Sequence, residues 1–188
     1  MRRRRLAVAA LFAALFAVLL PRAAAAYEHQ WHVGVGFGYS LLAGEDPPDQ
    51  PDAGPTYHGL GGSLHVTYGL TDAFNAMAQV DFTGYSGGEL VVGSASIGAG
   101  YVIDILEWVP YVGLMVGGYQ LGVFFDGCDA PGVSCGATRL GLSAPIGLDY
   151  QLSRNFAVGV QGRYHLLLGD EVAHILTAFA RAEYIWGY

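Results

Sequence analysis

The chain has 188 residues, of which 53% are hydrophobic and 13% are charged, and its formal charge at pH 7 is −7. Five of its nine basic residues lie within the first 26 positions, so the remainder has four arginines, no lysine and sixteen acids. Because contacts with phosphate need clustered cations, this balance argues against a nucleic-acid partner. The 28 glycines, without a Pro-rich or Ser-rich linker, favour tightly curved strands over disorder.

Residues 1–26 have the three parts of a secretory signal peptide. Four arginines follow the initiating methionine, an apolar run extends to Leu20, and small alanines end the segment. A membrane-spanning helix is the competing interpretation, but it needs about 20 consecutive apolar residues. We therefore expect cleavage after Ala26 and one mature domain, residues 27–188, with a formal charge of −12 from its four arginines and sixteen acids.

The mature chain contains eight segments with the two-residue period of a β-strand. Apolar or aromatic side chains occupy every second position, and Gly, Ser and other polar residues occupy the positions between them. The predicted strands are 30–42, 59–70, 74–83, 91–103, 109–123, 139–152, 156–165 and 173–188. We expect the apolar set to face lipid, at positions that include Val35, Leu64, Val80, Ile97, Leu142, Val160 and Ala180.

The segment 109–123 keeps this alternation less well than the others. Apolar residues up to Val116 favour one parity, whereas Tyr119 and the apolar residues after it favour the other. A β-bulge adds one residue to a strand and reverses the parity beyond it. We therefore predict a bulge near Gly117 and Gly118.

The connections between the predicted strands alternate in kind. The longer and mostly acidic ones are 43–56, 85–89, 124–138 and 168–172. The tight ones are 71–73, 104–108 and 153–155. An even number of strands, with short turns on one side and longer loops on the other, is typical of a transmembrane β-barrel.

The final segment, 173–188, has three aromatic residues near one end of its apolar face. They are Tyr184, Trp186 and Tyr188, and such a group suits the aromatic girdle at a membrane interface. The segment resembles the C-terminal strand of bacterial outer-membrane β-barrels, in which alternating aromatics ending on a terminal one form the assembly signal. This resemblance implies that the outer-membrane assembly machinery is a partner of the chain.

Two further stretches resemble the OmpA/OmpX/opacity-type family of eight-stranded barrels. They are 109–114, which contains the PYVG motif, and 147–160, which matches a late hairpin of that family. The resemblance covers the mature chain and implies an all-β, eight-stranded, antiparallel, up-and-down transmembrane barrel. It also implies a monomer in the lipid of the bacterial outer membrane with both termini in the periplasm. A soluble lipocalin-like barrel is the alternative, but its polar face would carry more charges than this one.

Six charged residues fall on the polar, inward parity. They are Asp81, Arg139, Asp149, Arg163, Arg181 and Glu183. Ionised groups in a narrow lumen are costly unless they are paired, so we expect a charge network inside the barrel. Counting from the turns, we predict that Arg181 pairs with Asp149 or Glu183. We also predict that Arg163 lies nearer the extracellular end, with Arg139 and Asp81.

Histidines and cysteines are the remaining candidates for chemistry. His32, His65 and His165 fall on the inward parity and His29, His58 and His174 on the outward one. His32 and His65 are expected near each other, but two histidines without a third ligand do not indicate a metal site, and we expect no metal or cofactor. Cys128 and Cys135 are the only cysteines, and export to an oxidising compartment predicts a disulfide between them.

The sequence pattern predicts the cellular location of the protein better than its activity. We expect a non-enzymatic role in envelope structure or surface interaction, with an unknown extracellular ligand. A narrow pore or small-ligand barrel is the alternative, because the many inward glycines leave room in the lumen. A lipid-modifying enzyme is the third possibility. Related barrels of that kind need a serine two residues after a histidine, and Leu167 stands at that position after His165.

Overall fold

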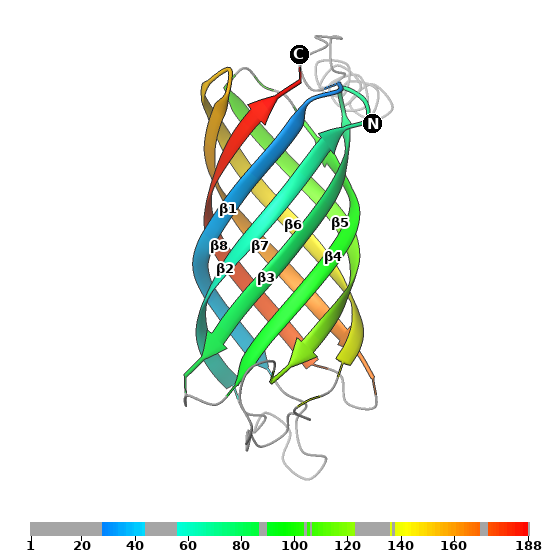
Figure 1. The fold of residues 1–188 in the computed structure, drawn as a ribbon, viewed down its shortest axis with the longest axis vertical. Coiled ribbons are helices and arrows are strands. Elements are labelled where there is room, and N and C mark those ends of the chain that lie inside the picture. Colours follow the sequence, from blue (N-terminus) through cyan, green and yellow to red (C-terminus); the bar gives the residue numbers. More distant parts are fainter. Residues whose placement is uncertain are drawn as a thin grey trace, which may run out of the picture.

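The computed structural model describes residues 28–43, 56–86, 90–103, 105, 107–122, 136, 138–169 and 173–187. Eight antiparallel strands form a closed barrel, in which each strand pairs with the next along the chain and the last pairs with the first (Figure 1). The strands are β1 Trp31–Ala43, β2 Thr56–Gly69, β3 Phe74–Tyr85, β4 Val91–Val102, β5 Trp108–Leu121, β6 Thr138–Ser153, β7 Phe156–Leu168 and β8 Ala173–Trp186. The predicted fold class is confirmed. The described residues contain no helix whose length and hydropathy would let it span a bilayer.

In this barrel the apolar side chains are exposed on the outside and the polar side chains are buried inside. Outward side chains are apolar and exposed, such as Ile97 at 65% and Leu64 at 60%, whereas inward polar side chains such as Gln161 are 4% exposed. Alternate residues of a strand point to opposite faces, so the sequence period dictates this division. All seven residues predicted to face outward do so. An outer surface of this kind is stable in lipid.

The two ends of the barrel differ. β1 begins and β8 ends at the same end, here called the terminus end, which lies at the top of Figure 1. Every strand contributes an outward aromatic residue there: Trp31, Tyr68, Phe74, Tyr101, Trp108, Tyr150, Phe156, Tyr184 and Trp186. Neighbouring rings touch, with centroids 4.6 Å apart for Trp31 and Tyr68 and 4.8 Å apart for Trp108 and Tyr150. The opposite end, here called the loop end, is where the four longer connections join the strands.

The interior also differs from end to end. At the loop end, inward apolar side chains form a cluster of Leu42, Tyr85, Leu90, Val92, Tyr119, Leu121, Leu167, Ala173 and Ile175. A second apolar cluster, nearer the terminus end, contains Met77, Val102, Val109, Tyr111 and Met115. Polar and charged side chains lie among and between these clusters. A polar interior was expected from the sequence, and the apolar clusters were not predicted.

The predicted bulge in β5 is wrong. Residues 111–121 of β5 pair with residues 92–102 of β4 in one unbroken register. Tyr119 and Leu121 are both 1% exposed and face the lumen as part of the loop-end apolar cluster. The apolar parity changes along β5 because the lumen itself becomes apolar, and the direction of the strand's side chains does not change. The register shift recorded within the described strands lies instead at Gln151 and Ser153, beside the turn into β7.

Several predictions fall outside the described residues. These are the signal peptide in residues 1–26, the disulfide between Cys128 and Cys135, and the terminal Tyr188.

Candidate functional site: the charged lumen

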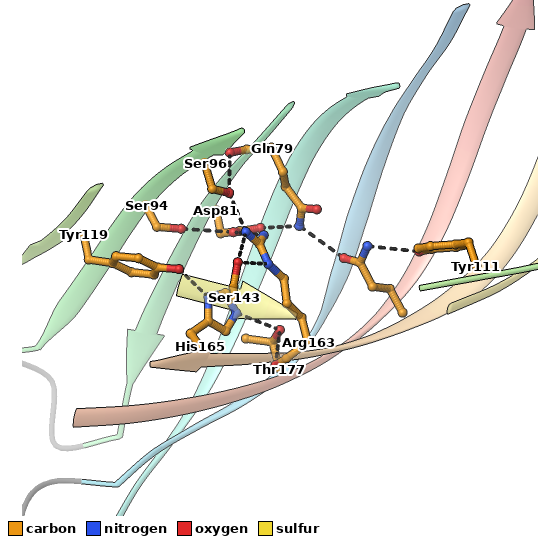
Figure 2. Close-up of polar contacts among 11 residues, drawn as sticks. Gln79, Asp81, Ser94, Ser96, Tyr111, Tyr119, Ser143, Arg163, His165 and Thr177 are labelled. Atoms are coloured by element: carbon orange, nitrogen blue, oxygen red, sulfur yellow. Dashed lines mark hydrogen bonds and ion pairs between the residues drawn. The ribbon is translucent and has the colours of Figure 1, made fainter. Parts of the chain in front are cut away.

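An ion pair crosses the middle of the barrel. Arg163 on β7 donates from Nη1 to Oδ2 of Asp81 on β3 at 2.9 Å. Because the eight strands close into a ring in chain order, β3 and β7 lie on opposite sides of it. The guanidinium of Arg163, which is 1% exposed, therefore spans the lumen. Figure 2 shows this pair at the centre of its hydrogen-bonding partners.

Serine hydroxyls complete the surroundings of this pair. Arg163 donates from Nε and Nη2 to Oγ of Ser143, at 3.0 and 2.8 Å, and from Nη2 to Oγ of Ser96. Ser94 donates to the carboxylate of Asp81 at 3.0 Å. These serines therefore act as hydrogen-bonding partners of the two charges.

A second bridge crosses the lumen beside the first. Gln79 on β3 donates to Oε1 of Gln161 on β7 at 3.2 Å, and Gln161 donates to the hydroxyl of Tyr111 at 3.0 Å (Figure 2). Gln79 also donates to Asp81 at 2.6 Å. The side chains of opposite strands thus meet twice, with the glutamine pair one step nearer the terminus end, and the network continues from there to Tyr111.

Arg181 forms the other half of the network, nearer the terminus end. Its guanidinium pairs with Glu183, lies 3.4 Å from Oδ1 of Asp149 through Nε, and donates to the hydroxyl of Tyr111. Glu183 also accepts from Nδ1 of His32 at 3.1 Å and from Nε2 of His65 at 2.8 Å. The structure therefore brings Arg181 to both acids that the sequence analysis named for it, and it brings His32 and His65 to one carboxylate.

Inward glycines make these contacts possible. Gly159 stands in register between Asp149 on β6 and Arg181 on β8, and a Cβ on it would collide with the Asp149 carboxylate. Gly34 stands likewise between His65 and Glu183, and a Cβ there would collide with the His65 ring. The space that these glycines leave is filled by side chains of the two flanking strands. This finding removes the argument that inward glycines open the lumen.

Arg139 does not join the Arg163 and Asp81 pair as predicted. It pairs in register with Tyr119, six residues along β6 from Pro145, which is the partner of Arg163. Its guanidinium lies beside Gly169 at the loop end of the barrel. The prediction that Arg139 lies with Arg163 is wrong, because Arg163 lies opposite Pro145 in the β6–β7 hairpin and Arg139 is six residues farther from the turn.

Lumen-facing tyrosines were not among the predicted site residues, although Tyr85, Tyr111 and Tyr119 face the lumen and bond to other inward side chains. Besides Tyr111, Tyr119 bonds to Nδ1 of His165 at 3.0 Å and Tyr85 to the hydroxyl of Ser40 at 2.7 Å. Their positions on the inward parity of the strands could have identified them. For Tyr119 the predicted bulge reversed this parity and so placed its side chain outside.

The described residues contain no group of three or more His, Cys, Asp or Glu side chains placed to hold a metal ion. The nearest arrangement is His32, His65 and Glu183, in which both imidazoles donate to the carboxylate that also pairs with Arg181. A cation would have to displace the guanidinium from this site. The arrangement is suited to holding the neighbouring strands β8, β1 and β2 together on one side of the lumen.

An antiparallel barrel with an apolar outer surface, an aromatic girdle and a charged interior defines a transmembrane β-barrel protein. Residues 10–178 match the model of the outer membrane protein beta-barrel domain, and the chain belongs to this family of the bacterial outer membrane. None of the curated proteins matches the chain.

Solved structures with the same fold support this assignment. Neisserial surface protein A is 16% identical, with a TM-score of 0.63 over 82% of this chain and 98% of that one. The N-terminal β-barrel domain of OprF from Pseudomonas aeruginosa is 16% identical, with a TM-score of 0.54 over 85% of this chain and 98% of that one. Ail, the attachment invasion locus protein of Yersinia pestis, is 17% identical, with a TM-score of 0.53 over 85% and 99%. At these identities the likeness shows the fold alone.

Proposed function

We propose that this protein is a closed outer-membrane barrel with a non-enzymatic role in envelope structure and surface interaction, and that its lumen is not a pore. The observation that carries the proposal is the ion pair between Arg163 and Asp81, which joins opposite strands. An eight-stranded barrel is only wide enough for its own side chains to fill it. A solute or ion in transit would have to separate two buried charges.

Two further features support a closed lumen. The loop-end apolar cluster fills the lumen at that level, where Leu42, Tyr119 and Leu121 are each at most 1% exposed. A hollow at the terminus end, lined by residues that include His32, Asp149 and Arg181, has a volume of about 20 Å³. A cavity of this size holds on the order of one water molecule. The inward glycines no longer support the narrow-pore alternative, because neighbouring side chains fill the space beside Gly34 and Gly159.

The proposed orientation places the terminus end in the periplasm. The complete aromatic girdle and the short turns lie at that end, and short turns of bacterial barrels are periplasmic. The four connections at the loop end then face outside. They contain nine of the sixteen acids and no arginine or lysine: Glu45, Asp46, Asp49, Asp52, Glu89, Asp126, Asp129, Asp170 and Glu171.

This charge distribution supports an interaction surface for cationic partners. A surface of one sign attracts ligands of the other and repels those of its own, in a salt-dependent way. Purified protein in phosphatidylcholine vesicles should therefore bind an oligolysine peptide at low salt and not heparin, while the vesicles release no entrapped glycerol-sized solute. A variant with the four acids of residues 45–52 changed to amides should lose part of the peptide binding. Solute release by the wild type, or binding of heparin in place of the peptide, would contradict the proposal.

A further inference from the structure

A hollow opens on the outward face of β1, β2 and β3 at the loop end. Its volume is about 340 Å³, and Tyr39, His58, Leu60, Gly84 and Ser86 are among the residues that line it. The floor lies over Gly84, where a Cβ would meet no atom within 4 Å, and the side chain of Leu60, 60% exposed, forms one wall. The hollow is continuous with the apolar outer surface, which has another hollow of about 460 Å³ over β4 to β7.

Hydrogen-bonding groups line the rim of this hollow. The hydroxyl of Tyr39 bonds to Nδ1 of His58, and the two rings lie 5.9 Å apart at an angle of 36°. This bond leaves Nε2 as the second hydrogen-bonding position of the imidazole. The hydroxyl of Ser86 adds another such group where β3 ends. An apolar floor beside polar groups suits an amphiphile.

Charge limits which amphiphile fits. The chain has no lysine, and of its four mature arginines two lie in the lumen, Arg139 lies at its loop-end mouth and Arg154 lies in the turn after β6 at the terminus end. The loop end therefore has no lysine or arginine on its outward face, while its connections are acidic. An anionic headgroup would meet repulsion there, whereas an uncharged sugar can use hydroxyl, imidazole and aromatic partners.

We propose that this hollow binds a neutral glycolipid, with part of an acyl chain over Leu60 and Gly84 and the sugar hydrogen-bonded to His58, Tyr39 and Ser86. In the orientation proposed above this lipid belongs to the outer leaflet. The binding itself depends on neither that orientation nor a closed lumen. The proposed orientation and the closed lumen can each be wrong while the lipid still binds.

Two pairs of variants test the site. Gly84→Leu places a side chain in the hollow from an exposed strand position where a Cβ meets no atom within 4 Å. Gly118→Leu is its matched control, because Gly118 on β5 also has nothing within 4 Å of a Cβ and does not line the hollow. His58→Gln alters the rim. His174→Gln is its control, because His174 bonds to Tyr164 at 2.6 Å in a similar Tyr–His pair that does not line the hollow.

The experiment is native mass spectrometry of protein refolded in phosphatidylcholine nanodiscs with a few mole per cent of glucosyl diacylglycerol or, separately, of phosphatidylglycerol with and without Mg²⁺. Wild type, Gly118→Leu and His174→Gln should each retain one glucosyl lipid in preference to phosphatidylglycerol. Gly84→Leu should lose it, and His58→Gln should retain it at least about threefold less, as expected for one hydrogen bond in a membrane. Equal retention by Gly84→Leu and Gly118→Leu, or a preference for phosphatidylglycerol with Mg²⁺, would overturn the proposal. Heat-dependent gel mobility verifies folding, and if Gly84→Leu fails to fold, the comparison of His58→Gln with His174→Gln decides.

Discussion

Replacing Asp81 by Asn tests whether the centre of the lumen is dry. The change removes the charge opposite Arg163 and preserves the size of the side chain. Asp81 is 5% exposed and Arg163 1%, so the remaining guanidinium would be buried without its counter-ion. Removing one partner of a buried ion pair costs about 3 to 5 kcal/mol. The hydroxyls of Ser96 and Ser143 still accept from Arg163, so we expect a loss near the lower limit, about 3 kcal/mol.

The assay is reversible urea unfolding in lipid vesicles, followed by tryptophan fluorescence. Glu107→Gln is the control, because Glu107 lies exposed in the turn before β5. A double-mutant cycle with Arg163→Met should give a coupling energy of at least about 2 kcal/mol, because the double variant leaves no unpaired charge. If Asp81→Asn loses no more stability than Glu107→Gln, water fills the lumen and the reasoning fails.

Three other predictions concern the outer surface and the undescribed parts of the chain. Ile97→Arg, in the middle of β4 and facing outward, should cost about 2 to 4 kcal/mol in the same unfolding assay, and Ile97→Leu should cost little. Deletion of Tyr188 should reduce outer-membrane assembly in cells and leave refolding of purified protein unchanged, and equal defects in both would argue against an assembly signal. Cys128 and Cys135 should resist maleimide labelling until a reductant is added, and rapid labelling of unreduced protein would disprove the disulfide.

The alternation of apolar and polar residues determined most of the fold in advance. A period of two fixes which side chains point outward, and eight such segments with alternating turn lengths allow few topologies other than a barrel. This reasoning worked best where the lumen is polar, as at Gln161 and Arg181. It failed at Tyr119, where the lumen is apolar, because an inward apolar side chain then looks like an outward one.

The contacts inside the lumen were less accessible to sequence reasoning. Arg181 could be matched with Asp149 because one strand separates them and the intervening turn is short. The pairing of Arg163 with Asp81 across the whole barrel depends on shear and stagger, which no local pattern records. Arg139, by contrast, was misplaced within the β6–β7 hairpin, where counting from the turn would have separated it from Arg163. The role of Gly34 and Gly159 as gaps for neighbouring side chains was visible only once the strands were in register.

Ion conductance of the purified barrel in a planar bilayer is the most direct test of the closed lumen. Lipid alone and a wide porin serve as the negative and positive controls. Arg163 pairs with Asp81 across the lumen, and the loop-end apolar cluster fills the lumen on the loop side of this pair. The protein should therefore give no current steps above the lipid baseline. Reproducible steps of constant size from the wild-type protein would contradict the closed lumen and support the narrow pore.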